Sequence, residues 1–275
     1  MSDAPPSPTL TETLDGLRQE DGVWKAHVAT GWSQGRAGFG GVVTALALAA
    51  VRRETGIAHK LRSFTMAFVG PANGDVTIAV TPLRAGRSAS FVQAMLIGPD
   101  GGVAGSFTAC FGPDRESRLS RPAAADSALP DRDGAMALPF VEGVVPVFLR
   151  HFDVRVAQGL PFMGKQEPEV RWWVRHRDPA ARGTETGLVS LLDVLPPAAT
   201  PMIQGPVPVA SLTWFVDFPE GLEAGDLARP APEGWHLQRS VADHVGDGFS
   251  GQAMTTHAAN GRLVAIHRQC VGIFG

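Results

Sequence analysis

Cysteine, long apolar runs and blocks of basic residues are all scarce in this sequence. The two cysteines, Cys110 and Cys270, stand in apolar strand-like contexts without C-x-x-C spacing, so we expect buried small side chains rather than a disulfide or a metal ligand. The longest apolar run, residues 42–51, is about half of what a membrane span needs. Lys and Arg never stand in a block of more than two, and the formal net charge is -3, which argues against a nucleic-acid partner.

The chain has 275 residues and 44% hydrophobic content. It can therefore bury a sizeable core, and its length fits two domains of about 100 to 150 residues or one large one. The first residues, MSDAPPSPTLTETLDGL, contain an early acid and several prolines but no apolar stretch, unlike a secretory signal or a transit peptide. We therefore expect a cytoplasmic protein without a membrane partner.

The sequence resembles itself at an offset of about 150 residues. GGVVTALALAA from Gly40 lies over TGLVSLLDVLPPA from Thr186, and the triplet at 63–65 lies over that at 211–213. QAM occurs at 93–95 and at 252–254, and the segments after it end in ACFG and QCVGIFG. The matches keep their order, which predicts a repeat over residues 1–112 and a second over residues 146–275. The Pro-, Ala- and charge-rich residues 113–145 are interpreted as a linker that packs little.

Each repeat is predicted to hold one buried helix among strands. The expected helices cover residues 42–51 and 186–195, and the expected strands cover 23–29, 61–69, 76–83, 88–97, 103–111, 147–156, 170–175, 209–218, 236–245, 250–258 and 263–271. Short links make the sheets antiparallel, and a helix that is apolar all round must be wrapped by its sheet. We expect an α+β fold, a double hotdog with two fused repeats, each an antiparallel sheet wrapped around one long helix.

Several motifs appear in order: F-G-G at 39–41, R-S-F at 62–64, F-x-x-P at 68–71, G-R-S at 86–88, S-L-T-W at 211–214 and G-R-L-V-A-x-x-x-Q at 261–269. This series resembles the TesB-like acyl-CoA thioesterases of the double-hotdog thioesterase superfamily. The resemblance implies acyl-CoA as the substrate, no cofactor and no metal, and a homodimer. It also implies that Asp193, Ser211 and Gln269 hold the hydrolytic water, with Thr213 as the alternative hydroxyl.

Asp193 is unusual on physical grounds alone. It stands between Leu192 and Val194 near the C-terminal end of an apolar helix, where desolvation and the helix dipole both oppose a carboxylate. The matching residue of the first repeat is Ala47. A carboxylate whose pKa is raised by burial suits a general base for water. The alternative is an exposed Asp on the last turn before Pro196-Pro197.

Other candidates follow from local pattern. Ser211 and Thr213 are expected on one face of a strand, and the alternative is a cross-strand hydroxyl pair without a catalytic role. Gln269 is expected to share a face with His267, and the alternative is a solvated Gln side chain. Glycine-opened helix starts, at Gly40-Gly41 or at Gly187, offer backbone N–H groups to an oxyanion. Arg84 and Arg87 flank the G-R-S turn, where they either meet CoA phosphates or are simply solvated.

Three other functions are compatible with parts of the sequence. Residues 31–35 match the G-x-S-x-G elbow of serine hydrolases around Ser33, but Gly35 to Gly38 delay the helix and alternating βα units are lacking. A hotdog dehydratase is disfavoured because no His follows Asp193 at helical spacing. A non-catalytic acyl-binding module would bind acyl-CoA without turnover. The late histidines, at 236, 244, 257 and 267, lie on three strands without metal-site spacing.

Overall fold

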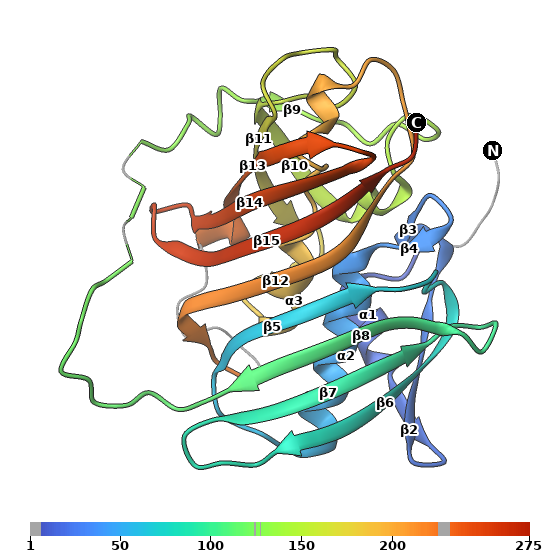
Figure 1. Cartoon of the computed structure of the whole chain (residues 1–275), viewed down its shortest axis with the longest axis vertical. Helices are drawn as coiled ribbons and strands as arrows, with labels where there is room; N and C mark the ends of the chain where they lie inside the picture. The colour runs from blue at the N-terminus through green and yellow to red at the C-terminus, as the bar shows by residue number, and fades with distance from the viewer. Residues whose placement is uncertain (1–6, 124, 127, 225–231) are drawn as a thin grey trace.

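Figure 1 shows a computed structural model of the chain, which describes residues 7–275 apart from 124, 127 and 225–231. Residues 1–6 of the N-terminal segment and residues 124 and 127 of the expected linker therefore lie outside the described residues. The helices are α1 (Leu10–Asp15), α2 (Gly40–Thr55) and α3 (Glu185–Leu191). The strands of the first half are β1 (Arg18–Glu20), β2 (Val23–Val28), β3 (Ser33–Gln34), β4 (Ala37–Gly38), β5 (Leu61–Phe68), β6 (Gly74–Arg84), β7 (Ser90–Ile97) and β8 (Val103–Phe111). Those that follow are β9 (Met136–Ala137), β10 (Phe152–Gln158), β11 (Glu169–His176), β12 (Val209–Leu222), β13 (His236–Gly246), β14 (Phe249–Ala258) and β15 (Leu263–Ile273).

Among the described residues, one antiparallel sheet of 13 strands carries both halves (Figure 1). Its order is β1-β2-β6-β7-β8-β5-β12-β15-β14-β13-β11-β10-β9. Within it, β2-β6-β7-β8-β5 and β11-β13-β14-β15-β12 follow the same plan, since in each the strand before the helix lies outermost and the strand after it lies at the junction. The halves meet where β5 pairs with β12, so that Ala67 lies opposite Thr213.

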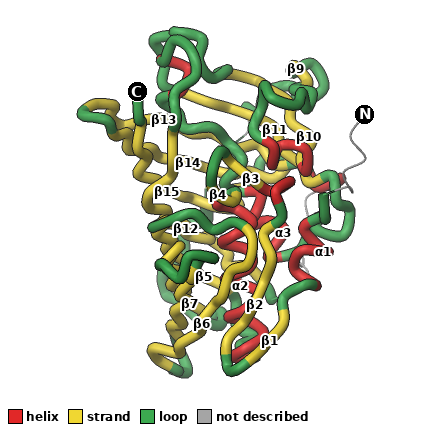
Figure 2. Tube along the Cα trace, turned by 90° about the vertical axis from the view of Figure 1, so that its right-hand side faces the viewer, coloured by secondary structure: helices red, strands yellow, loops and turns green. Residues whose placement is uncertain are grey.

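Helix α2 lies against the inner face of the sheet, which is the face that carries the helices in Figure 2. Every residue from Gly40 to Val51 is buried, as the all-apolar pattern predicted. The helix ends at Gly56, whose φ of 63° suits glycine, and whose N–H donates to the carbonyl of Arg52.

The described residues of the second half do not form a long helix where one was predicted, so that part of the prediction is wrong. α3 covers seven residues and ends at Leu191, although the pattern predicted a helix over 186–195. Pro196 and Pro197 lack N–H groups and disfavour helical geometry in the residues before them. Residues 192–202 therefore continue as turns and a short 3₁₀ helix, and nearly all of them remain buried.

A buried ion pair ties the two helices together. Arg52 in the last turn of α2 donates from Nη2 and Nε to the carboxylate of Glu185, the first residue of α3, at 2.5 and 3.0 Å. The side chains are 12% and 2% exposed. Arg52 Nη1 also donates to the carbonyls of Ile57 and His59. The guanidinium therefore fastens the end of α2 both to the other half and to the loop that leads into β5.

The segment between the halves packs more than the sequence indicated. Residues 113–123 run exposed away from β8. Further along, β9 pairs with β10, Leu129 packs on the cluster around Trp173, and Leu138 and Phe140 pack on the main core. The expectation of a linker that packs little is wrong for this later part.

Smaller corrections concern one strand and the cysteines. The strand expected over 147–156 begins as a 3₁₀ helix, Val147–His151, and only then becomes β10. Cys110 and Cys270 are free and half-buried rather than fully buried. Within the described residues, none of the helices has the length and apolar character needed to cross a bilayer.

Candidate active site

Asp193 is buried between the C-terminal end of α3 and the N-terminus of α2. It follows the end of α3 by two residues and is 8% exposed. The Gly41 N–H, at the N-terminus of α2, donates to its carboxylate. A Cβ built on Gly40 would lie 2.5 Å from Asp193 Oδ2, so a glycine is needed for this approach. The expectation that a helix dipole opposes Asp193 is thus incomplete, because the positive end of α2 faces it.

Burial and hydrogen bonds act against each other on this carboxyl group. Desolvation raises the pKa of Asp193 to about 7, although hydrogen bonds from Gln269 and Gly41 lower it. The Gln269 Nε2 donates to Asp193 Oδ1 at 2.6 Å. An aspartate with this pKa can accept a proton near neutral pH and give it back within one reaction cycle.

Gln269 is itself held by a second glutamine. Gln252 Nε2 donates to Gln269 Oε1 at 2.8 Å, and the backbone N–H of Ala198 donates to Gln252 Oε1 at 2.8 Å. Both amides lie on the inner face of the sheet, where β14 and β15 pair Gln252 with Gln269. The exposed alternative considered for Gln269 is excluded, since its side chain is buried.

The two candidate hydroxyls do not share a face, contrary to the expected alternation. The ladder between β12 and β15 pairs Ser211 with Val271 and Thr213 with Cys270, so Leu212 forms a bulge. Ser211 is half-buried and lines the cavity that contains Asp193. Thr213 is exposed and lines a depression on the opposite, outer face of the sheet.

The cavity beside Asp193 has a volume of about 80 Å³. Its lining is mostly small and comes from both halves: Gln34, Ala37, Gly38, Gly40, Val43, Phe68, Gly70, Ala72, Ala104, Asp193, Val209, Ala210 and Ser211. Since one water needs at least about 10–15 Å³ of such volume, the space fits several waters or the reacting end of a ligand.

Gly187 lies at the other end of α3 and has a structural use. Its N–H donates to the N-capping hydroxyl of Thr184 at 3.0 Å. Its carbonyl accepts from His176 Nε2 at 2.8 Å. Gly40 and Gly41 are the glycines that the structure brings to Asp193, and Gly187 is not among the residues that line the cavity.

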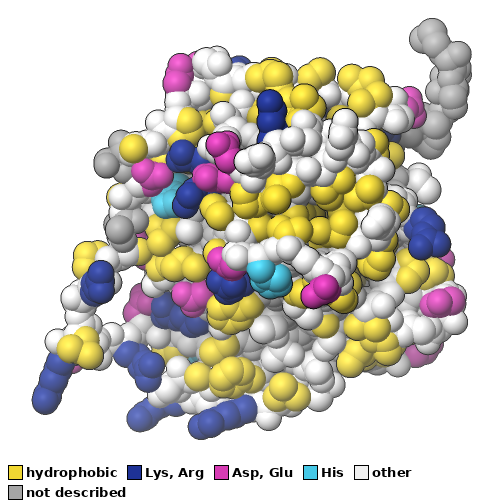
Figure 3. Space-filling view, turned by 45° about the horizontal axis from the view of Figure 1, so that its top comes forward, with side chains coloured by type: hydrophobic (Ala, Val, Ile, Leu, Met, Phe, Trp, Pro, Cys, Tyr) yellow, Lys and Arg dark blue, Asp and Glu magenta, His cyan; other side chains and the backbone are white. Residues whose placement is uncertain are grey.

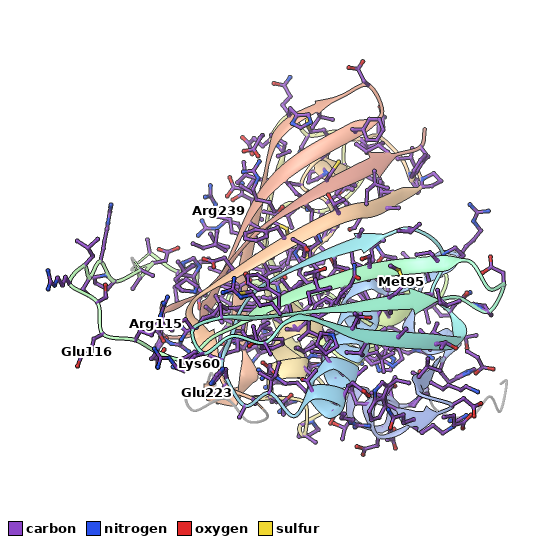
Figure 4. All side chains as sticks on the ribbon, turned by 60° about the horizontal axis from the view of Figure 1, so that its bottom comes forward. Lys60, Met95, Arg115, Glu116, Glu223 and Arg239 are labelled. Carbon is purple, nitrogen blue, oxygen red and sulfur yellow. The ribbon has the colours of Figure 1, made fainter. Side chains whose placement is uncertain are left out.

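Arg84 and Arg87 also lie away from Asp193. Arg84 pairs with Phe91 at the end of the sheet where β5 begins, whereas Phe68 at the end of β5 lines the cavity. The length of β5 separates the two ends by roughly 20 Å. Lys and Arg gather at that end in Figure 3, at the lower left. Nearby, Lys60 Nζ lies 3.2 Å from Glu223 Oε1 (Figure 4).

Ser33 does not have the geometry of a nucleophile elbow. It adopts an extended conformation, with φ of -76° and ψ of 143°, and pairs with Gly38 in the β3-β4 hairpin, whereas an elbow is a strained strand-to-helix turn. The neighbouring His151 contacts Ser7 and the Gly31 carbonyl. In the part of the chain that the structure describes, no three His, Cys, Asp or Glu side chains lie together so that they could hold a metal ion.

Comparison with known proteins decides the family. Residues 28–112 match the acyl-CoA thioesterase N-terminal domain, and residues 122–273 match the acyl-CoA thioesterase C-terminal domain. The chain belongs to the acyl-CoA thioesterase family. None of the curated proteins matches it.

Solved structures place this acyl-CoA thioesterase family member among hotdog folds. A conserved protein of unknown function with a hot dog fold from Alicyclobacillus acidocaldarius is 23% identical, with a TM-score of 0.82 and 98% and 99% of the two chains covered. The acyl-CoA thioesterase II TesB2 of Mycobacterium marinum is 20% identical, with a TM-score of 0.73 and coverage of 97% and 99%. The tesB protein of Mycobacterium avium subs paratuberculosis is 18% identical, with a TM-score of 0.72 and coverage of 97% and 98%. At these identities the likeness establishes the fold.

Two polar residues of this acyl-CoA thioesterase family member were not predicted from the sequence. Gln34 lines the cavity, and Gln252 supports Gln269. Gln252 belongs to the repeated QAM string. Its alternation with Met254 and Thr256, which are also buried, was a usable signal, since it places an amide on an inward-facing row. Gln93, its counterpart in the string, is half-buried between the inward-facing Val92 and Ala94 and so points outward.

Proposed function

We propose that the protein hydrolyses an acyl-CoA thioester to a free acid and CoA. The observation that carries the proposal is a buried carboxylate, held by an amide and a helix N-terminus, at the wall of a cavity that also contains a hydroxyl. The acyl-CoA thioesterase family to which the chain belongs supports the same reaction. The proposal assigns the general base to Asp193, with Ser211 orienting the water. Gln269, predicted from the sequence to hold the water, does not line the cavity, and the proposal has it act through its hydrogen bond to Asp193.

In the proposed reaction, ionised Asp193 takes a proton from the water as the water oxygen bonds to the thioester carbon. The carbonyl oxygen becomes an oxyanion, which the backbone N–H of Gly40 in the first turn of α2 is suited to stabilise, since the Gly41 N–H already donates to Asp193. The oxyanion then reforms the carbonyl, the C–S bond breaks, and protonated Asp193 returns its proton to the CoA thiolate. No cofactor enters any of these steps.

The cavity holds only the reacting end of such a substrate. Pockets that enclose a whole ligand typically measure about 300–1,000 Å³, several times the 80 Å³ beside Asp193. The proposal therefore places the thioester carbon here and the CoA outside. Arg84 and Arg87 stay candidates for the CoA phosphates, at the far end of the sheet.

A thiol-release assay tests the proposal. Acyl-CoA substrates of increasing chain length are supplied to the purified protein, and the free CoA thiol is measured from pH 5 to 9. We expect turnover that rises with pH through about 7, because Asp193 must lose its proton to act as a base. Acyl-CoA binding without thiol release from any substrate would instead favour the binding-module alternative.

The hydroxyl assignment is tested by a matched pair of variants. Ser211→Ala is expected to lower kcat by about 2- to 10-fold, the equivalent of one hydrogen bond to the reacting water. Thr213→Ala should leave kcat unchanged, because Thr213 lies on the other face of the sheet. The reverse pattern would assign the role to Thr213.

Ser33→Ala separates hydrolysis by water from a serine-hydrolase mechanism. We expect wild-type turnover from this variant, since the water is activated by Asp193 in the proposed reaction. A loss of more than about 100-fold, as removal of a nucleophile gives, would require Ser33 to be the nucleophile.

We also propose the finer organisation that the sequence suggested. Two hotdog units, residues 1–112 and 146–275, are joined by residues 113–145, and the common strand order of the halves supports this division. A cytoplasmic location, a part in lipid metabolism and a homodimer belong to the same proposal. Light scattering on the purified protein measures the oligomeric state.

A further inference from the structure

The contacts behind Asp193 form a directed series of hydrogen bonds. It starts at the backbone N–H of Ala198, passes through the amides of Gln252 and Gln269, and ends at Asp193 Oδ1. Each of the three donor–acceptor distances is between 2.6 and 2.8 Å. The two glutamines are 0% and 6% exposed, so bulk water does not compete for these groups.

The first member of the series fixes the direction of all the others. A backbone N–H can only donate, so it must meet the oxygen of Gln252 and not its nitrogen. The Gln252 amide nitrogen then points to Gln269 and requires an oxygen there. Gln269 must consequently turn its own nitrogen toward Asp193. A flipped Gln269 would bring two N–H donors together in a buried site.

We propose that Gln252 is a positioning residue that locks the amide of Gln269 so that it always presents an N–H to Asp193. This rests on the proposed function, because it explains how the general base is kept in its ionised form. Neither glutamine lines the cavity. Gln252 acts through Gln269, which contacts Asp193.

The fixed orientation of Gln269 matters because a freely rotating amide could donate to ionised Asp193 or accept from protonated Asp193. Protonated Asp193 is a donor and needs an acceptor, which a flipped Gln269 would provide through Oε1. In the locked arrangement that acceptor is withheld, so protonated Asp193 only accepts from Gln269 through its carbonyl oxygen, a weaker hydrogen bond than the one the carboxylate accepts. Release of the lock therefore stabilises protonated Asp193 and raises its pKa.

The neighbouring titratable groups do not set the protonation of Asp193 in place of Gln269. His267 lies two residues from Gln269 on the inner face of β15 and is fully buried. Desolvation lowers the pKa of His267 to about 3, so it is neutral at working pH. Its Nδ1 accepts from Trp214 Nε1, and its Nε2 meets the hydroxyl of Thr256, which leaves it occupied. Arg268 and His244 line the depression on the outer face.

Gln252→Met tests the proposal, with Gln238→Met as its matched control. Gln238 is also 0% exposed on the inner face, and its Nε2 donates to the Leu191 carbonyl at 2.7 Å. Each variant thus replaces a buried amide with the same side chain and loses one hydrogen bond to the backbone. For Gln252→Met we expect kcat at pH 7 to fall on the order of 10-fold, less than loss of the base itself. The lower limb of its pH–rate profile should move to higher pH, and kcat should recover toward wild type near pH 9.

Gln238→Met should keep the wild-type pH profile, whatever it does to stability. An equal loss of kcat at every pH in Gln252→Met would indicate a purely structural role and overturn the proposal. So would an identical upward shift in Gln238→Met.

The protonation of Asp193 can also be followed without turnover. Infrared carboxyl bands, assigned by their absence from Asp193→Asn, report its pKa in the wild type and in Gln252→Met. A higher pKa in Gln252→Met supports the proposal even if the wild type releases no thiol, in which case the hydrolase function alone fails. An unchanged pKa overturns it. If Gln252→Met does not fold, a neutron structure of the wild type above pH 8 decides, because Gln269 Oε1 facing Asp193 would contradict the lock.

Discussion

Replacing Asp193 with Asn is expected to lower kcat for thioester hydrolysis by on the order of 10² to 10⁴-fold. Asn keeps the shape and an oxygen that can accept from Gln269 Nε2, but it cannot take a proton from water. The loss should therefore appear in kcat more than in KM. Thiol release under saturating acyl-CoA measures it.

Asp217→Asn is the matched control for this variant. Asp217 is a half-buried aspartate on β12 whose pKa is also raised by desolvation. Its neighbours Val216 and Phe218 face inward, so Asp217 faces away from the cavity. Wild-type kcat in Asp217→Asn, together with a deep loss in Asp193→Asn, would assign the effect to the site. Near-normal turnover by Asp193→Asn would refute the mechanism.

Asp193→Asn is also expected to change the pH dependence of stability. The pKa of Asp193 is higher in the folded protein than its ordinary value of 3.8, at about 7. The folded state therefore binds this proton more tightly, and the free energy of unfolding falls as pH rises from 4 through 7. The fall is on the order of 4 kcal/mol for a shift of this size. Asn has no such cost, so its stability relative to wild type should increase over that range, as urea unfolding at pH 4.5 and pH 8 would measure.

Arg52→Met is expected to destabilise the protein by about 3–5 kcal/mol, because it leaves Glu185 buried without its partner. Two carbonyls, those of Ile57 and His59, also lose their donor. Urea unfolding at pH 7 provides the measurement, and a loss below about 1 kcal/mol would show that the pair is worth no more than a surface ion pair.

The double variant Arg52→Met/Glu185→Met separates these contributions. Removal of both charges avoids the uncompensated carboxylate, so we expect the double variant to be more stable than Arg52→Met alone. Recovery should stay incomplete, since the two carbonyls still lack their donor. A double variant less stable than the single one would mean that Glu185 has a further partner.

Local pattern was enough to predict the burial of α2 and most strands. The apolar residues from Val42 to Val51 are compatible with a helix that is surrounded on all sides, and alternation marks strands such as β7 and β14. The internal repeat also singled out Asp193, because its counterpart is Ala47. These features depend on residues close together in the sequence.

The sequence-based predictions failed where the local structure depends on contacts between distant residues or on one extra residue in a strand. The bulge at Leu212 reverses which side chains face inward, and alternation cannot show it. The end of α3 depends on a proline pair and on the packing of residues 192–202 in the core. The direction of Gln252 depends on one backbone N–H, at Ala198, which the fold brings from 54 residues away.

Asp193 belongs to the later part of the chain, while the glycines it touches begin a helix of the earlier part. In the proposed mechanism neither half could therefore work alone, because one half contains the acid and the other contains the glycines that contact it. The proposed site thus exists only while the two halves stay joined along the pairing of β5 with β12.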